Sequence, residues 1–232
     1  MTLPFLPELP SRTGGSRVSN LITPIYNWDI RAGRYTNRAT GQFVSFAEVR
    51  NALEGVIANT SNNMLVLSNQ LENSLISLAE WERGMIQEIK TLHIASVASA
   101  KGGWAQMTKA DYSFVSQKIM EQYVYLKAFA EQIYSGKQRL NGTFTIRTKL
   151  YGQAGRGTFE DARRREAVGK GYDLEMRILG IADHCNGCLQ QAGLKWQPMG
   201  TLHSIGAEEC ATNCHCYFMF KNSQTNEVIE FY

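Results

Sequence analysis

The stretch that decides the C-terminal fold reads Asp-His-Cys-Asn-Gly-Cys at residues 183–188 and ends with Cys-Ala-Thr-Asn-Cys-His-Cys at residues 210–216. All five cysteines of the 232-residue chain lie inside it, at C-x2-C and C-x3-C-x-C spacing. Two thiols separated by two residues can chelate one ion from a tight turn, while a second pair from elsewhere in the chain closes a tetrahedral shell. The pattern predicts a thiophilic metal site. Disulfide bonds and free buried thiols are the alternatives.

For zinc we expect the four ligands Cys185, Cys188, Cys214 and Cys216, with Cys210 as the alternative fourth ligand and His184 or His203 as further substitutes. A closed shell of four thiolates is structural, because zinc catalysis requires an open position for water. The sequence contains no H-E-x-x-H motif, and no H-x-E motif paired with P-C-x-x-C.

Cysteine-based catalysis is also not expected. Cys185 follows His184 directly, and adjacent residues of an extended strand point to opposite faces. A thioredoxin-type C-x-x-C motif would open a helix in a βαβ unit, and the flanks of residues 185–188 lack that pattern. We therefore predict that the protein is not an enzyme.

The composition sets wider bounds. Charged residues make up 19% of the chain, the net charge is +3 and the isoelectric point is about 8.6, a mild basic excess that does not by itself imply nucleic acid. The length is ample for a core, so a metal would act as a local staple. A signal peptide and an apolar run of about 18 residues are both lacking, so we expect a soluble protein made in a reducing cytoplasm, without membrane contact.

The N-terminal segment, residues 1–44, is expected to be extended. Pro4, Pro7 and Pro10 disfavour helix and favour polyproline II geometry. The segment is either an arm that lies along a neighbouring subunit or a disordered terminus. Residues 33–44 predict a small hairpin around a turn containing Gly41.

Residues 45–170 predict a helical domain. Three helix starts carry a hydroxyl residue followed three positions later by an acid, at Ser45 with Glu48, Ser77 with Glu80, and Thr108 with Asp111. Apolar residues recur at helical spacing behind each start, which indicates an antiparallel bundle. The polar cluster at residues 59–63 could be a kink or a break in the first helix.

Positive charge is concentrated between residues 134 and 170, where nine lysines and arginines accompany three acids. The run is either a solvated helix face or a contact surface for an acidic partner or a phosphate backbone. The candidate contact residues are Arg147, Lys149, Arg156, Arg163, Arg164 and Arg165.

Residues 171–232 predict a cysteine-rich, zinc-binding β module. Residues 172–181 alternate, with Leu174, Met176 and Ile178 on one side and Asp173, Glu175 and Arg177 on a solvated side. Residues 216–220 and 227–232 flank a polar loop and should form a terminal hairpin. The cysteine loops would then lie between three strands, as in a zinc ribbon. The expected fold class is α+β, a helical bundle followed by a zinc-stapled β module.

The C-terminal part resembles the phage Mu F-like family of minor head proteins of tailed bacteriophages. The residues that carry the likeness are Arg147-Thr148, Tyr151 and Ala154 on a helix, the 183–188 motif after a strand, and the closing Asn213-Cys214-His215-Cys216. They span roughly residues 140–220. The chain departs from the family pattern at Ala211-Thr212, where a proline commonly precedes the Asn-Cys pair, often with a histidine before it, and in having the extra Cys210.

The resemblance implies a virion component of the portal vertex that takes part in head morphogenesis, with a role in DNA packaging or ejection. Its partners would be portal, capsid and connector proteins, within an oligomer assembled in the host cytoplasm, with non-specific DNA contact in addition. The alternative is a zinc-dependent nucleic-acid-binding protein that acts outside the virion.

Overall fold

The computed structural model describes residues 26–29 and 34–229 and shows an α+β protein, as predicted. The helices are α1 (Phe46–Glu72), α2 (Leu78–Ala100), α3 (Lys109–Tyr134), α4 (Gly142–Gln153), α5 (Gly155–Gly169) and α6 (Asn186–Gly193), with 3-10 turns η1 (Trp104–Gln106) and η2 (Ala211–Asn213). The strands are β1 (Tyr26–Asp29), β2 (Arg34–Asn37), β3 (Leu174–Ile178), β4 (Gln197–Pro198), β5 (Tyr217–Lys221) and β6 (Val228–Ile229). Of the predicted N-terminal arm, residues 1–44, residues 1–25 and 30–33 lie outside the described residues.

The three long helices begin where the capping boxes predicted. At α2 the Ser77 hydroxyl accepts the Glu80 N–H, and the Glu80 carboxylate accepts the Ser77 N–H at 2.8 Å. The same reciprocal pair caps α1 and α3. Each box satisfies helix N–H groups that have no partner within the helix.

Helix α1 runs without a break through the polar cluster at residues 59–63. The buried Thr60 hydroxyl donates to the Val56 carbonyl of the preceding turn, so its polar group is satisfied inside the helix. Ser61 lies against Gly152 of α4. A Cβ atom built on Gly152 would come within 2.0 Å of the Ser61 Oγ, which means that only glycine allows the two helices to approach this closely.

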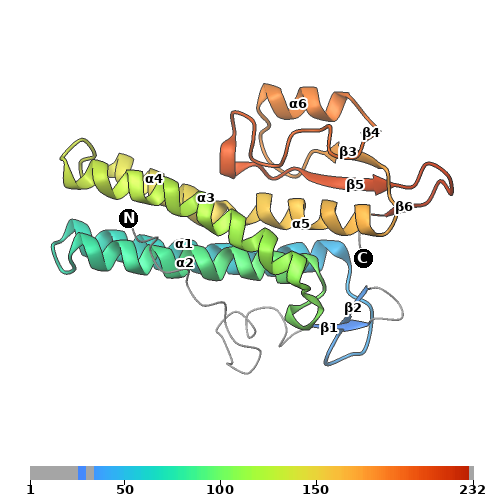
Figure 1. Ribbon diagram of the computed structural model, residues 1–232, viewed down its shortest axis with the longest axis horizontal. Helices are drawn as coiled ribbons and strands as arrows, with labels where there is room; N and C mark the ends of the chain where they lie inside the picture. Colours follow the sequence, from blue (N-terminus) through green and yellow to red (C-terminus); the bar gives the residue numbers. More distant parts are fainter. Residues whose placement is uncertain (1–25, 30–33, 230–232) are drawn as a thin grey trace.

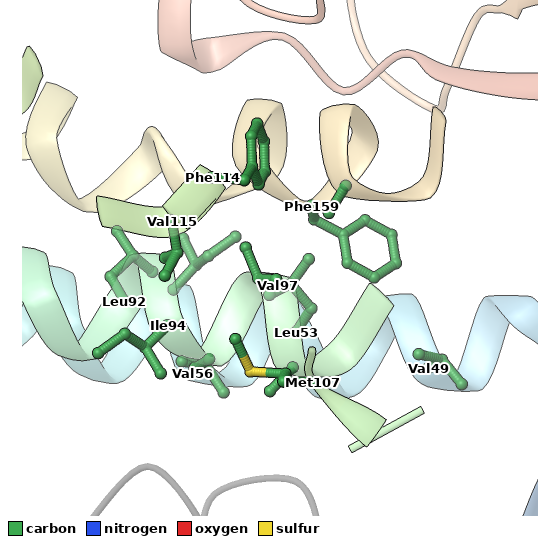
Figure 2. Close-up of a cluster of buried hydrophobic side chains, with 14 of the residues drawn as sticks. Val49, Leu53, Val56, Leu92, Ile94, Val97, Met107, Phe114, Val115 and Phe159 are labelled. Atoms are coloured by element: carbon green, nitrogen blue, oxygen red, sulfur yellow. The ribbon is translucent and has the colours of Figure 1, made fainter. Parts of the chain in front are cut away.

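The helices pack as an antiparallel bundle around two apolar clusters. The cluster in Figure 2 joins the first half of α1 to the second half of α2, to the start of α3 and to Phe159 of α5. The other cluster joins the opposite halves of these helices to α4, around Trp81 and Phe129. The rings of Trp81 and Phe129 meet edge to face, with centroids 5.5 Å apart.

Helix α5 lies between the α1–α2 layer and the C-terminal sheet, and α6 contacts β3 and lies farther from the bundle than the sheet does (Figure 1). The sheet is antiparallel with strand order β4-β3-β5-β6. Strands β5 and β6 form the predicted terminal hairpin, in which Phe220 pairs with Ile229. Helix α5 therefore packs against both the bundle and the sheet.

The predicted orientation of β3 was wrong. Glu175 and Arg177 are 0% and 1% exposed, whereas Leu174, Met176 and Ile178 are only partly buried. The charged side chains point inward because α5 and the cysteine loops supply partners for them. Across the ladder, Glu175 pairs with Phe220 and Arg177 pairs with Phe218.

The predicted hairpin near residue 40 is confirmed. Thr36 bridges to Phe43 around Gly41, whose φ of 67° suits glycine, and β1 adds a further antiparallel strand beside β2. Tyr35 ties this small sheet to the bundle, since its hydroxyl donates to the Ser99 carbonyl at 2.6 Å. None of the described helices combines the length and the apolar character needed to cross a membrane.

Candidate metal centre

Three chain segments bring the cysteines together next to Arg177 of β3. Cys185 is the N-cap residue of α6, and Cys188 lies in the first turn of that helix. Cys210 and Cys214 flank η2, and Cys216 comes directly before β5. The C-x2-C motif therefore does open a helix, which its flanks did not predict. The adjoining strands β3 and β4 are antiparallel, so the unit is not a parallel βαβ unit.

Cys188 occupies the middle of the cluster. Its sulfur lies 3.5 Å from the sulfurs of Cys210 and Cys214. The cysteines form two sets, Cys185–Cys188–Cys210 and Cys188–Cys214–Cys216, and the sulfurs of each set lie within 4.8 Å of one another. Zinc–sulfur bonds of about 2.3 Å in a tetrahedron place two sulfurs about 3.8 Å apart. All five thiols are free, so the cluster could hold a metal ion.

The cluster is buried unevenly. Cys188, Cys214 and Cys216 are buried beneath the sheet among Leu202 and Phe218, whereas Cys185 and Cys210 are partly exposed at its outer side. An apolar shell of this kind excludes water and strengthens the bond between thiolate and metal.

Local hydrogen bonds favour a thiolate at the first cysteine of each closely spaced pair. The Cys188 N–H lowers the pKa of Cys185. Hydrogen bonds from the thiol and from the N–H of Cys216 lower the pKa of Cys214 to about 4, against its burial. Both pairs thus share one arrangement, in which the N–H of the second cysteine stabilises the sulfur of the first.

The remaining thiols resist ionisation in the absence of a cation. Burial raises the pKa of Cys188 and of Cys210, and the hydrogen bond to Cys214 together with burial raises the pKa of Cys216. Such closely packed sulfurs ionise together only when a positive charge lies among them, and a bound metal ion supplies it.

His184 contacts this cluster at one cysteine, Cys216, whereas His203 does not contact it. The Nε2 atom of His184 lies 2.8 Å from the Gly180 carbonyl oxygen, and Nδ1 lies 3.8 Å from the Cys216 sulfur. The carbonyl fixes the proton on Nε2 and leaves the Nδ1 lone pair directed at the cluster. His203 is exposed and contacts Glu208 at 2.7 Å instead.

Arg177 is a part of the site that the sequence pattern did not reveal. Its buried guanidinium lies 3.5 Å from the Cys188 sulfur and also donates to the carbonyls of His203 and Ser204. It therefore holds the 203–204 loop and places a fixed positive charge beside the central thiol. The alternation of β3 predicted that Arg177 lies on a solvated face. In the sequence, only the apolar Phe218, which pairs with Arg177 on the adjacent strand, indicated a buried face.

Two of the predicted basic contact residues have partners within the bundle. Arg156 makes a bidentate ion pair with Glu54, with both distances at 2.7 Å. Arg147 hydrogen-bonds Gln132, and its guanidinium lies 4.1 Å from the centre of the Phe129 ring.

Two more hold α5 against its neighbours. Arg163 is 1% exposed, pairs with Glu160 at 2.7 Å and lies 3.9 Å from the centre of the Phe46 ring. Arg164 pairs with Glu175 of β3 at 2.7 Å. Lys149 and Arg165 are exposed. The six candidate contact residues thus do not form one continuous surface, because the side chains of four of them are engaged inside the protein.

A pocket of about 360 Å³ adjoins the cysteine cluster. Lys118 and Asp161 line one side and pair at 2.9 Å, and Cys214 lines another. His93 also borders the pocket. Its Nδ1 lies 2.7 Å from the Thr158 hydroxyl, and burial lowers its pKa to about 3, so that it is neutral at physiological pH.

No family model, curated protein or solved structure matches the chain. The likeness to the Mu F-like family stays a prediction that rests on the motifs themselves.

Proposed function

We propose that the protein is a structural, non-enzymatic component whose C-terminal sheet is stapled by zinc. The observation that carries the proposal is the cysteine cluster, in which Cys188, Cys214 and Cys216 are buried and His184 directs a ring nitrogen toward Cys216. Ligands packed around an ion on all sides leave no position for a reacting water, which is typical of structural zinc.

Zinc fits the donor set best. Soft thiolates joined by an imidazole select zinc over hard cations such as magnesium and calcium, and the 3.5 Å distances from the Cys188 sulfur to those of Cys210 and Cys214 are close to the spacing in a tetrahedral shell. The ligands expected for one ion are Cys185, Cys188, Cys214 and Cys216, with Cys210 as the alternative. When bound, the ion would neutralise the thiolates and join the 185–188 turn to the 210–216 loop.

We place this component in the head of a tailed-phage virion, at the portal vertex. The cysteine and helix motifs shared with the Mu F-like family support this placement. A second support is the apolar surface of α3, where Val124, Tyr125 and Tyr134 are 66%, 63% and 88% exposed. Large exposed apolar side chains are typical of surfaces that become covered on assembly, as contact with portal, capsid or connector proteins would require.

The internal ion pairs weigh against the alternative of a zinc-dependent nucleic-acid-binding protein. Affinity for a phosphate backbone depends on cationic side chains that can reach it. Among the six candidate contact residues, Arg156, Arg163 and Arg164 are already paired with acids, and only Lys149 and Arg165 are exposed. A non-specific contact with packaged DNA would use these two side chains.

The experiment measures the metal bound to the purified chain and the association of the chain with purified phage heads. Elemental analysis of the purified chain should find bound zinc, and the chain should co-sediment with purified heads at a fixed stoichiometry. Purified protein without bound metal would refute the proposal that zinc holds the C-terminal sheet together. Recovery only in a soluble fraction bound to nucleic acid, with binding lost in a Lys149→Gln/Arg165→Gln double variant, would favour the alternative.

A further inference from the structure

The two cysteine sets meet at one atom. A single tetrahedral ion needs four sulfurs at mutual distances of about 3.8 Å. Among the described residues, the close sets contain three thiols each and share only Cys188, whose sulfur is 3.5 Å from Cys210 on one side and from Cys214 on the other. A central sulfur between two pairs is the arrangement of a bridging thiolate.

The inner set has a histidine beside it, in contact with Cys216 but outside the group of three sulfurs that lie within 4.8 Å of one another. His184 donates through Nε2 to the Gly180 carbonyl, so the unprotonated Nδ1 faces Cys216 at 3.8 Å. Zinc bonds of about 2.3 Å to sulfur and about 2.0 Å to nitrogen place these two atoms about 3.6 Å apart in a tetrahedron. A histidine held by a backbone carbonyl in this way is typical of a metal ligand.

The outer set has a carboxylate beside it. Glu209 hydrogen-bonds the Cys185 thiol and accepts the Gly187 N–H at 3.1 Å. It lies on the exposed side of the cluster, opposite the buried Cys188. A carboxylate oxygen is an ordinary fourth ligand for zinc.

We propose that the site is a two-zinc centre in which the Cys188 thiolate bridges the ions. The inner ion is held by Cys188, Cys214, Cys216 and His184, and the outer ion by Cys185, Cys188, Cys210 and Glu209. This inference rests on the proposed zinc staple and extends it.

The charges of such a centre are nearly balanced. Five thiolates and one carboxylate carry six negative charges, of which two divalent ions offset four. The buried Arg177 guanidinium, 3.5 Å from the bridging sulfur, offsets another. Arg177 thus supplies the charge that allows one buried sulfur to serve two ions. A one-ion centre would leave Cys210 without a role.

The test measures metal stoichiometry by native mass spectrometry and elemental analysis of the full chain, purified under reducing conditions and loaded with Zn²⁺. The wild type should bind two ions. Cys210→Ser and His184→Ala should each bind one, and Cys188→Ser should bind none tightly. His203→Ala is the matched control, and it should retain two ions because His203 lies outside both sets.

The outcomes separate the two proposals. One ion in the wild type would overturn the bridged centre and leave the zinc staple standing, whereas no ion would overturn both. Two ions retained by Cys210→Ser would overturn the ligand assignment. Loading with Co²⁺ gives a check on the intact wild type, since a thiolate bridge couples the two ions and should reduce the electron paramagnetic signal as the second equivalent binds.

Discussion

Replacement of Glu175 by alanine should be among the most destabilising single changes in the C-terminal sheet. The Glu175 carboxylate is fully buried, lies 2.7 Å from the Arg164 guanidinium and accepts the Leu202 N–H at 2.9 Å. Its removal leaves a partly buried arginine and a buried N–H without partners. Breaking a buried ion pair on one side costs about 3–5 kcal/mol, a large share of the roughly 5–15 kcal/mol that stabilises a typical domain.

The assay is urea unfolding of the purified protein, followed by far-ultraviolet circular dichroism and by tryptophan fluorescence. Asp173→Ala is the matched control, because Asp173 is an exposed carboxylate directly before the same strand, and its loss should cost much less. A Glu175→Ala cost of about 0.5 kcal/mol or less, the range of ordinary surface substitutions, would refute the buried orientation of β3.

Three further predictions concern the bundle and are checked by the same unfolding measurements. Gly152→Ala should destabilise by about 1–3 kcal/mol because the new Cβ would meet Ser61 at 2.0 Å; Gly55→Ala, where nothing lies within 4 Å, should stabilise by about 0.5–1 kcal/mol. Burial lowers the pKa of His93 to about 3 from 6.5, so the free energy of unfolding of the wild type should fall as pH drops below 6.5, by up to about 1.4 kcal/mol per pH unit. The His93→Leu variant should lack this contribution to the pH dependence. An equal slope in the variant would contradict the neutral buried state of His93. Ser77→Ala should lower the free energy of unfolding by about 1 kcal/mol through loss of the α2 cap. An unchanged unfolding midpoint would show that the cap does not stabilise the folded protein.

The bundle could be predicted from the sequence because its signals are local. A capping box needs only two residues three positions apart, so Ser77 and Glu80 mark the start of α2 without any tertiary information. The continuity of α1 through residues 59–63 could not be predicted, since the burial of Thr60 and the contact of Ser61 with Gly152 of α4 are tertiary features.

The face of β3 could not be predicted because its burial is decided by distant partners. Alternation separates the two faces of a strand but does not say which one is covered. Arg164, Leu202 and the cysteine cluster supply the partners that make burial of Glu175 and Arg177 favourable.

The cysteine cluster, the candidate metal site, was predictable in location but not in detail. Cysteine spacing identified the thiols that meet in space. The role of His184 depends on a carbonyl four residues earlier, at Gly180, and the central place of Cys188 depends on how α6 and the η2 loop meet.

Helix α5 limits how the C-terminal part could be transplanted into another protein. A fragment that begins at residue 171 would carry Glu175 without Arg164, and would uncover Phe218, whose backbone N–H is held by Glu160 of α5. The smallest portable unit therefore begins near Gly155 and takes the whole of α5 with it. Such a graft would also present to its new host the face of α5 that now packs on α2, so the recipient must offer a matching apolar groove.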